Sequence, residues 1–257
     1  MTMAQGNNLG PGEGRGLLVF DADDTLWWTQ EIYDMATAQC RILVEQAGFD
    51  GDAFVAAKDI LDVANVQHYG LSPLRFPISC RQAYEQLAGA EAQSEVAEAV
   101  QKAAGTVFTT PARLVDDVHS ILASLVAENW RLVMQTSGDR GIQEQRIGDS
   151  GLAGYFSEIK IVPKKTSDSF AERLVDDGRA AQEAWSVGNS LPSDINPALR
   201  VHMNAIWVPA HIWGHEKRET VAHQESGQLY HATYLKDILG ILQPELAVEP
   251  LLGQFGS

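Results

Sequence analysis

The sequence LLVFDADDTLWW occupies residues 17–28. It opens with an uninterrupted apolar run, Leu17–Phe20, which is the pattern of a strand buried on both faces of a parallel sheet. Asp21, Asp23 and Thr25 follow this run at alternate positions. Ligands in open parallel sheets bind at the carboxyl ends of the strands. The stretch therefore predicts a central strand with polar, reactive side chains at its end.

A helical insert is predicted directly after this strand. From residue 29, apolar residues recur every three or four positions, as at Ile32, Ala36, Cys40 and Leu43, and Gly48 ends the run as a helix C-cap would. Further helical patterns cover 52–66, 79–87 and 94–104, and little between 71 and 105 resembles a strand. We therefore expect a block of helices between the first strand and the second.

After Pro111, helical patterns and short apolar runs alternate. Strands are predicted over 131–135, 159–162, 184–187 and 205–208, helices over 115–128, 140–150, 167–176 and 193–200, and a closing strand and helix within 230–242. This alternation predicts an α/β fold, a doubly wound and mostly parallel Rossmann-like sheet carrying an inserted all-helical domain. The expected organisation is a flexible N-terminal tail at 1–16, an α/β core at 17–28 and 106–257, and the helical insert at 29–105.

Composition limits the class of protein. The chain has 257 residues, 45% apolar and 21% charged, which excludes a disordered or fibrous protein. Its net charge of −15 makes a basic face for nucleic acid or anionic lipid unexpected. The 2 cysteines are too few for a disulfide scaffold. Because neither a membrane-spanning run nor a signal peptide is evident, we expect a cytoplasmic protein that binds no nucleic acid and no membrane.

Reactive side chains follow several of the predicted strands. The first strand ends at Asp21 and the second at Thr136 and Ser137, while Lys164, Lys165, Asn189 and Asp194 follow the third and fourth strands. The carboxyl ends of parallel strands meet at one sheet edge, so these groups are expected to gather there. Carboxylate oxygens are ligands for Mg²⁺, which usually bridges to phosphate. The set therefore favours phosphoryl transfer.

In family order, these residues resemble the motifs of the haloacid dehalogenase-like hydrolases. DADDT at Asp21 resembles the first motif, LVMQTSG ending its strand at Thr136 the second, Lys165 the third-motif lysine, and GNSLPSD at 188–194 the fourth. The resemblance covers residues 17 to about 210 and identifies the helical insert as a cap domain. A single DxDxT motif also occurs as an Asx-turn or a helix cap, but four motifs in order favour the catalytic interpretation.

The resemblance implies a phosphatase mechanism. Asp21 would be the nucleophile that forms an aspartyl-phosphate, and Asp23 would be the general acid and base. Thr136, Ser137, Lys165 and the backbone N–H groups near Ala22 would bind the phosphoryl oxygens. The implied cofactor is Mg²⁺, held by Asp21, Asp23 through its carbonyl, and the fourth motif, and the implied substrate is a small phosphorylated metabolite.

The fourth motif departs from the family pattern, because Asn189 stands where an aspartate usually follows the glycine. We assign both Asn189 and Asp194 to the metal site. The sequence leaves open whether Asp194 coordinates the metal or orients Lys165, and whether Lys164 takes the role of Lys165.

Two other functions stay open beside the phosphatase. A 2-haloacid dehalogenase would lack a carboxylate two residues after its nucleophile, and Asp23 is present. A catalytically idle family member would bind a ligand or a partner, with Asn189 reflecting lost metal binding. Trp27 and Trp28 would either line the substrate pocket or pack at the junction with the cap. The substrate and the oligomeric state, monomer or homodimer, do not follow from the sequence.

Overall fold

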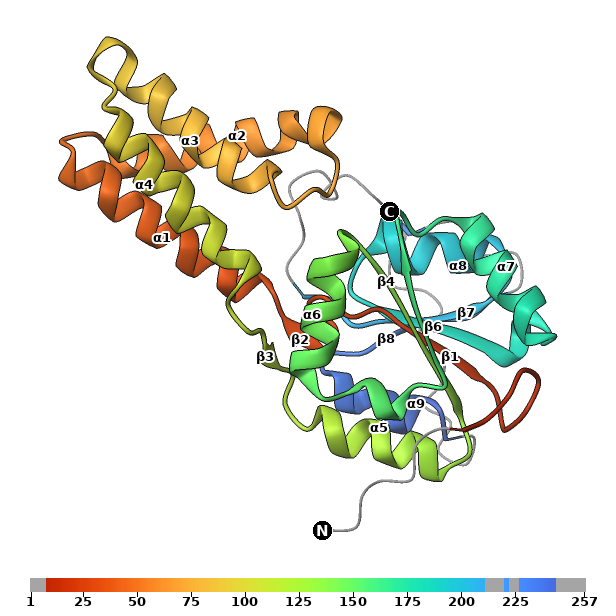
Figure 1. The fold of residues 1–257 in the computed structure, drawn as a ribbon. Helices are drawn as coiled ribbons and strands as arrows, with labels where there is room; N and C mark the ends of the chain where they lie inside the picture. The colour runs from red at the N-terminus through yellow and green to blue at the C-terminus, as the bar shows by residue number, and fades with distance from the viewer. Residues whose placement is uncertain (1–7, 211–219, 222–226, 244–257) are drawn as a thin grey trace, which may run out of the picture. The chain divides into compact units, whose positions relative to one another are not determined.

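The computed structural model describes residues 8–210, 220–221 and 227–243 (Figure 1). The chain divides into two compact units. The first, here called the sheet unit, consists of the described residues of Met1–Trp27, Leu114–Ser137 and Ile147–Ser257. The second, here called the helical unit, consists of Trp28–Arg113 and Gly138–Arg146. The insert expected at 29–105 lies within the helical unit, which continues to Arg113.

The sheet unit is built on a 6-stranded sheet in the order β5-β4-β1-β6-β7-β8, with every neighbouring pair parallel. The strands are β1 (Leu17–Phe20), β4 (Arg131–Ser137), β5 (Glu158–Val162), β6 (Ala184–Gly188), β7 (Asn204–Trp207) and β8 (Leu229–His231). All side chains of β1 are buried, because the strand lies at the centre of the sheet with neighbours on both sides. The predicted parallel α/β architecture is confirmed.

Helices cover the two faces of this sheet. The connecting segments contain α5 (Val118–Ala127), α6 (Arg140–Ser150), α7 (Ser167–Asp177), one π-helical turn (Leu191–Ile195), α8 (Asn196–Arg200) and α9 (Ile238–Ile241). Figure 1 shows α5 and α9 on one face and α7 and α8 on the other, and each of these two pairs is in contact. The first strand pairs with β4 on one side and β6 on the other, which places the carboxyl end of β1 where the sheet order reverses.

The helical unit contains α1 (Gln30–Gln46), α2 (Gly51–Tyr69), α3 (Arg75–Ala88) and α4 (Ser94–Gly105) (Figure 1). Each helix contributes to one apolar core, because the predicted spacings of three and four place apolar side chains on one face. The buried residues of this core include Ile32, Ala36, Cys40, Phe54, Phe76, Tyr84 and Val100. An all-helical insert after the first strand is therefore confirmed.

Two very short strands that the sequence patterns do not predict join the units. Trp27–Trp28 form β2, Arg113–Leu114 form β3, and the two strands pair with each other. The chain passes between the units once within each of these strands. A two-residue strand is too short to produce a periodic sequence signal.

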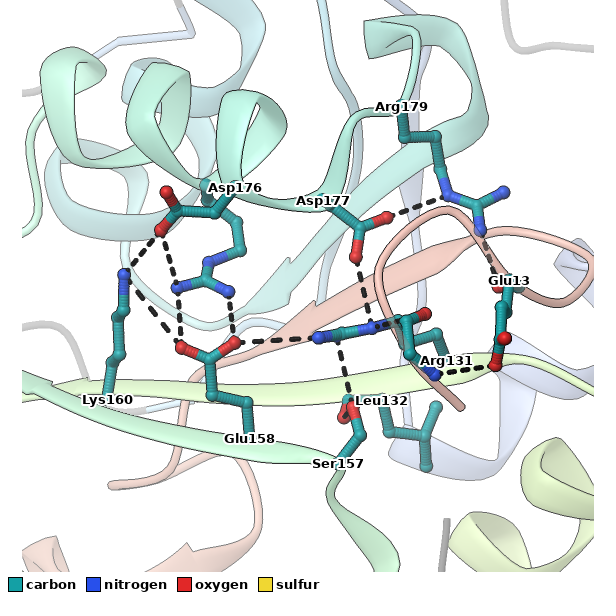
Figure 2. Close-up of polar contacts among 11 residues, drawn as sticks. Glu13, Arg131, Leu132, Ser157, Glu158, Lys160, Asp176, Asp177 and Arg179 are labelled. Carbon is teal, nitrogen blue, oxygen red and sulfur yellow. Dashed lines mark hydrogen bonds and ion pairs between the residues drawn. The ribbon is translucent and has the colours of Figure 1, made fainter. Parts of the chain in front are cut away.

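A buried network of ion pairs lies at the start of β4 and β5, the sheet edge opposite the strand ends that carry the motifs (Figure 2). Arg131 pairs through Nε with Asp177 Oδ1 at 3.1 Å, and Arg179 Nε lies 3.0 Å from Asp177 Oδ2. Arg173 holds both carboxylate oxygens of Glu158, at 2.5 and 3.0 Å. Buried charges are tolerated only when they are paired, so removing one partner here would be strongly destabilising.

The same network binds the segment that precedes β1. Arg131 Nε donates to the carbonyl oxygen of Gly10 at 3.1 Å, and Arg179 Nη2 donates to that of Glu13 at 2.5 Å. Arg15 donates to the carbonyl of Leu242 at 2.8 Å. The expected flexible tail covers 1–16, of which 1–7 lie outside the described residues. The described part, 8–16, is attached to the rest of the sheet unit by these contacts, which the low apolar content of the segment does not reveal.

Among the described residues, no helix has both the length and the apolar character needed to cross a membrane.

Candidate active site

The loop after β1 fixes the first motif at the sheet edge. The backbone N–H of Asp21 donates to the carbonyl of Val187 at 2.9 Å, which continues the β1–β6 ladder by one residue. The chain then turns, and the carbonyl of Ala22 accepts from the backbone N–H groups of Thr25 at 3.2 Å and Leu26 at 2.8 Å. Asp24 stands in this turn with a φ of 57°. Asp21 is thus held at the carboxyl end of the central strand, as the sequence predicts.

Lys165 connects the first motif to the fourth. Its Nζ donates hydrogen bonds to Asp21 Oδ1 and, at 2.6 Å, to Asp194 Oδ1. All three side chains are buried. Lys164 is exposed, so of the two lysines after β5 it is Lys165 that lies among the motif residues.

Both carboxylate oxygens of Asp194 accept hydrogen bonds from protein groups. Its Oδ1 accepts from Lys165, and its Oδ2 accepts from the backbone N–H of Ser190 at 3.0 Å. Gly188, the last residue of β6, leaves room for this carboxylate, because a Cβ at that position would lie 2.4 Å from Asp194 Cγ. These contacts favour the orienting role for Asp194 over direct metal coordination.

The side chains of Asn189 and Asp21 both contact the hydroxyl group of Thr25. Thr25 Oγ1 is 3.0 Å from Asp21 Oδ2 and 3.4 Å from Asn189 Oδ1. A hydroxyl has one proton, so the shorter distance identifies Asp21 as its main acceptor. The backbone of Asn189 is held from β7, where Trp207 Nε1 donates to the Asn189 carbonyl at 2.8 Å. The local sequence pattern around Trp207 does not indicate this contact.

Thr136 and Ser137 lie at the end of β4, which pairs with β1. Met134 is the register partner of Phe20, the last residue of β1. Thr136 follows Met134 by two residues, and Ala22 follows Phe20 by two residues. Thr136 is buried and Ser137 is half-buried. Strand register therefore places them at the same edge as Asp21.

Asp23 has a hydrogen-bond partner that the sequence pattern does not predict. Trp27 Nε1 donates to Asp23 Oδ1 at 2.7 Å. Trp27 is buried, whereas Asp23 is half-buried. The two carboxylates of the first motif thus have different surroundings, since Asp21 faces Lys165 and Asp23 faces an indole N–H.

Burial and the neighbouring charges shift the pKa of Asp21. Burial raises the pKa of Asp21 to about 7, the negative charge of Asp194 adds to the rise, and Lys165 opposes it. Burial alone would lower the pKa of Lys165, but the charges of Asp194 and Asp21 outweigh burial and raise it. Lys165 is therefore a permanent cation, while Asp21 is poised to change charge near neutral pH.

The oxygen donors at this edge fit Mg²⁺. Within the described part of the chain, no group of three or more His, Cys, Asp or Glu side chains is arranged to hold a metal. The Asp21 carboxylate and the Asn189 amide oxygen nevertheless both lie beside the Thr25 hydroxyl. Mg²⁺ binds through one or two carboxylates and retains waters or substrate phosphate. A donor set of one carboxylate, one amide oxygen and the carbonyl of Asp23 matches that requirement.

The chain has the haloacid dehalogenase-like fold. A haloacid dehalogenase-like family hydrolase from Xanthomonas campestris superposes with a TM-score of 0.71 at 22% identity, over 88% of this chain and 93% of that one. The HAD-hydrolase YfnB from Bacillus subtilis, bound to magnesium, gives 0.62 at 20% identity, over 90% and 99% of the two chains. L-2-haloacid dehalogenase from Xanthobacter autotrophicus gives 0.52 at 16% identity, over 87% and 96%.

A sequence relative is the pyrimidine 5'-nucleotidase PynA from Streptococcus pneumoniae, which is 27% identical over 108 residues. The match covers 39% of this chain and 46% of PynA, so it spans less than half of that protein. No protein-family model matches the chain. The structural neighbours thus include both a magnesium-bound hydrolase and a dehalogenase, and their similarity defines the fold and not the reaction.

Proposed function

We propose that the protein is a Mg²⁺-dependent phosphatase that hydrolyses a small phosphate monoester through an aspartyl-phosphate on Asp21. The observation that carries the proposal is the pair of carboxylates in the first motif, of which Asp21 faces Lys165 and Asp23 faces Trp27. Two acids can take different roles in one reaction when their environments differ. The helical insert would serve as the cap domain that the family resemblance implies.

Asp21 would attack the phosphorus atom through a carboxylate oxygen. The bond from phosphorus to the ester oxygen breaks, and Asp23 gives its proton to that leaving oxygen. Asp23 then takes a proton from a water molecule, whose oxygen attacks the phosphorus of the aspartyl-phosphate. Inorganic phosphate leaves, and both carboxyl groups return to their starting states.

The remaining residues would stabilise charge during transfer. Lys165, Thr136, Ser137 and the backbone N–H of Ala22 supply positive or donor groups at the sheet edge for the phosphoryl oxygens. Asp21, Asn189 and the carbonyl of Asp23 would hold Mg²⁺, which when bound offsets the negative charge of the phosphoryl group. Lys165 donates one hydrogen bond to Asp194 and one to Asp21, which leaves its third N–H for a substrate oxygen.

The dehalogenase alternative is less well supported by the residues. A halide leaves carbon without needing a proton, so Asp23 and its indole donor would have no task in that reaction. An idle, ligand-binding protein would have no need of a nucleophile at the sheet edge. Lost metal binding would, however, explain Asn189 in the fourth motif, so the test includes this alternative. The nucleotidase relative makes nucleoside monophosphates the first compounds to include among the phosphate esters.

The test is product release by the wild-type protein. Small phosphate monoesters, nucleoside monophosphates among them, are assayed for inorganic phosphate with MgCl₂ and with EDTA, and 2-chloropropionate is assayed for chloride. Phosphate release that EDTA abolishes supports the proposal. Chloride release that is insensitive to EDTA would replace it with a dehalogenase. Neither product, together with Mg²⁺ binding by calorimetry, would identify a binding protein.

A further inference from the structure

The side chain of Trp27 donates a hydrogen bond to Asp23, the second carboxylate of the first motif. The indole Nε1 of Trp27 lies 2.7 Å from Asp23 Oδ1, four residues earlier in the chain. We infer that Trp27 is a positioning residue that holds the Asp23 carboxyl group in the orientation needed for proton transfer to the leaving oxygen. This inference rests on the proposed function, since it assigns Trp27 to the same reaction.

The backbone around Trp27 makes it a fixed support. Its carbonyl accepts from the N–H of Asp24 at 2.7 Å, and its own N–H donates to the carbonyl of Ala22 at 3.4 Å. Asp23 and Trp27 are also linked as a β-bridge. The Trp27 ring is 1% exposed, so the surrounding side chains restrict its rotation. The turn therefore joins the tryptophan to the acidic residue through both backbone and side chain.

The direction of the hydrogen bond selects one oxygen of Asp23. An indole nitrogen is a donor and cannot accept, so Oδ1 must be the acceptor. In the acid form of Asp23, the carbonyl oxygen is the stronger acceptor, so this bond favours the form in which Oδ1 is the carbonyl oxygen and the proton is on Oδ2. Trp27 thus assigns the transferable proton to Oδ2. A phenylalanine would keep most of the ring packing but could not make this selection.

This role predicts an effect that depends on the leaving group. An alkoxide is a poor leaving group and needs a proton, whereas 2,4-dinitrophenolate leaves readily without one. A change that misplaces Asp23 therefore slows hydrolysis of alkyl phosphates and spares dinitrophenyl phosphate. A tryptophan that only packed the turn, or only lined a pocket, would affect both esters through folding or binding alike.

The experiment compares kcat/KM of Trp27→Phe and wild type on glycerol 2-phosphate and on 2,4-dinitrophenyl phosphate, with MgCl₂. We expect a loss of at least about 10-fold on the alkyl ester, a part of the roughly 10²–10⁴-fold that a general acid contributes. We expect a loss of less than about 3-fold on the dinitrophenyl ester. Asp23→Asn should show the same pattern more strongly, and adding Trp27→Phe to it should cause little further loss.

Trp130→Phe is the matched control. Trp130 is also a buried tryptophan of the sheet unit, but it directly precedes β4 at the sheet edge opposite Asp21. It reports what loss of a buried indole costs in stability alone, and its kcat/KM values should stay within about 3-fold of wild type on both esters. The inference is overturned if Trp27→Phe lowers kcat/KM equally on both esters, or lowers it on neither.

If Trp27→Phe does not fold, NMR tests the contact in variants that keep Trp27. The ¹H–¹⁵N resonance of the Trp27 indole should shift in Asp23→Ala and stay in place in Asp168→Ala, an exposed acidic residue at the start of α7. An unchanged Trp27 resonance in Asp23→Ala contradicts the contact itself. Failure of the proposed function is recognised separately, because wild type would then hydrolyse neither ester with Mg²⁺, and the catalytic role of Trp27 would fall with it.

Discussion

Asp194 Oδ1 accepts a hydrogen bond from Lys165 Nζ at 2.6 Å, inside a region where both side chains are buried. The other oxygen of Asp194 accepts from the backbone N–H of Ser190. One oxygen of Asp194 therefore holds the lysine, which in turn donates to Asp21, and the other oxygen fixes the Asp194 carboxylate to the backbone of the fourth motif. The Asn189 amide oxygen lies 3.4 Å from the Thr25 hydroxyl, which also contacts the other carboxylate oxygen of Asp21 at 3.0 Å. We therefore expect Asn189 and Asp194 to have different roles in the fourth motif.

Asp194→Asn is expected to lower kcat by about 10- to 100-fold, because small displacements of a charge-stabilising group are costly. The half-saturating Mg²⁺ concentration should change by less than about 3-fold, since the contacts assign Asp194 to Lys165. Steady-state assays across a MgCl₂ series separate the two effects. A large rise in the half-saturating Mg²⁺ concentration with kcat preserved would make Asp194 the metal ligand.

Asn189→Asp is expected to lower the half-saturating Mg²⁺ concentration by about 3- to 10-fold, because a carboxylate is a stronger ligand for Mg²⁺ than an amide oxygen. In EDTA the same variant should melt at a lower temperature than wild type, since the new charge lies near Asp21. Isothermal calorimetry and thermal melts with and without Mg²⁺ test both parts. Weaker Mg²⁺ binding by the variant would show that Asn189 is not a ligand.

Gly188→Ala is expected to displace Asp194, because the new Cβ would lie 2.4 Å from Asp194 Cγ and Oδ2. Overpacking of this kind costs about 1–3 kcal/mol of unfolding free energy, and kcat/KM should fall by about 10-fold or more as Lys165 moves with its partner. Urea unfolding and turnover are measured beside Gly148→Ala. Gly148 is helical with open space at its Cβ, so that variant should be neutral or slightly stabilising. Equal behaviour of the two variants would contradict the close packing at Gly188.

The pKa of Asp21 makes stability depend on pH when no metal is bound. Because the folded-state pKa is raised to about 7, the folded protein keeps this proton at pH values where the unfolded chain has lost it. The Asp21 contribution is therefore fully present at acidic pH and is lost as pH rises from about 4 to about 7. In EDTA, the stability of Asp21→Asn relative to wild type should increase over this window by on the order of 1 kcal/mol per pH unit. Denaturant unfolding at pH 4.5, 6 and 7.5 provides the test, and a difference that does not change with pH would contradict it.

The strands of the fold were predictable because they are short, apolar and separated by helical periodicity. β1 (Leu17–Phe20) has the predicted limits, and the other predicted strands that lie in the described residues differ from the observed ones by a few residues at most. The helical insert was predictable for the same reason, since its apolar positions follow the helical repeat. The pair β2–β3 was missed because two residues cannot show a period.

The candidate site was predictable only where residue type and chain order carry the information. Asp21, Lys165 and Asp194 come from different strand ends, and the parallel topology brings them together as expected. The choice between Lys164 and Lys165 needed the structure, because both follow β5 and only side-chain direction separates them. The hydrogen bonds donated by the indoles of Trp27 and Trp207 were not predicted, because the partner of an indole N–H depends on the local backbone and not on the residue type.

Trapping the reaction intermediate tests whether Asp21 carries the phosphoryl group. Wild type and Asp21→Asn are mixed with 2,4-dinitrophenyl phosphate and MgCl₂, quenched in acid within one turnover, and digested for mass spectrometry, with thermal melts to confirm that the variant is folded. We expect about 80 Da, the mass of one phosphoryl group, to be added to the wild-type peptide that contains Asp21. We expect no added mass and no turnover in the variant. Mg²⁺-dependent turnover that survives in Asp21→Asn, or a phosphoryl group found on another residue, would contradict this role of Asp21.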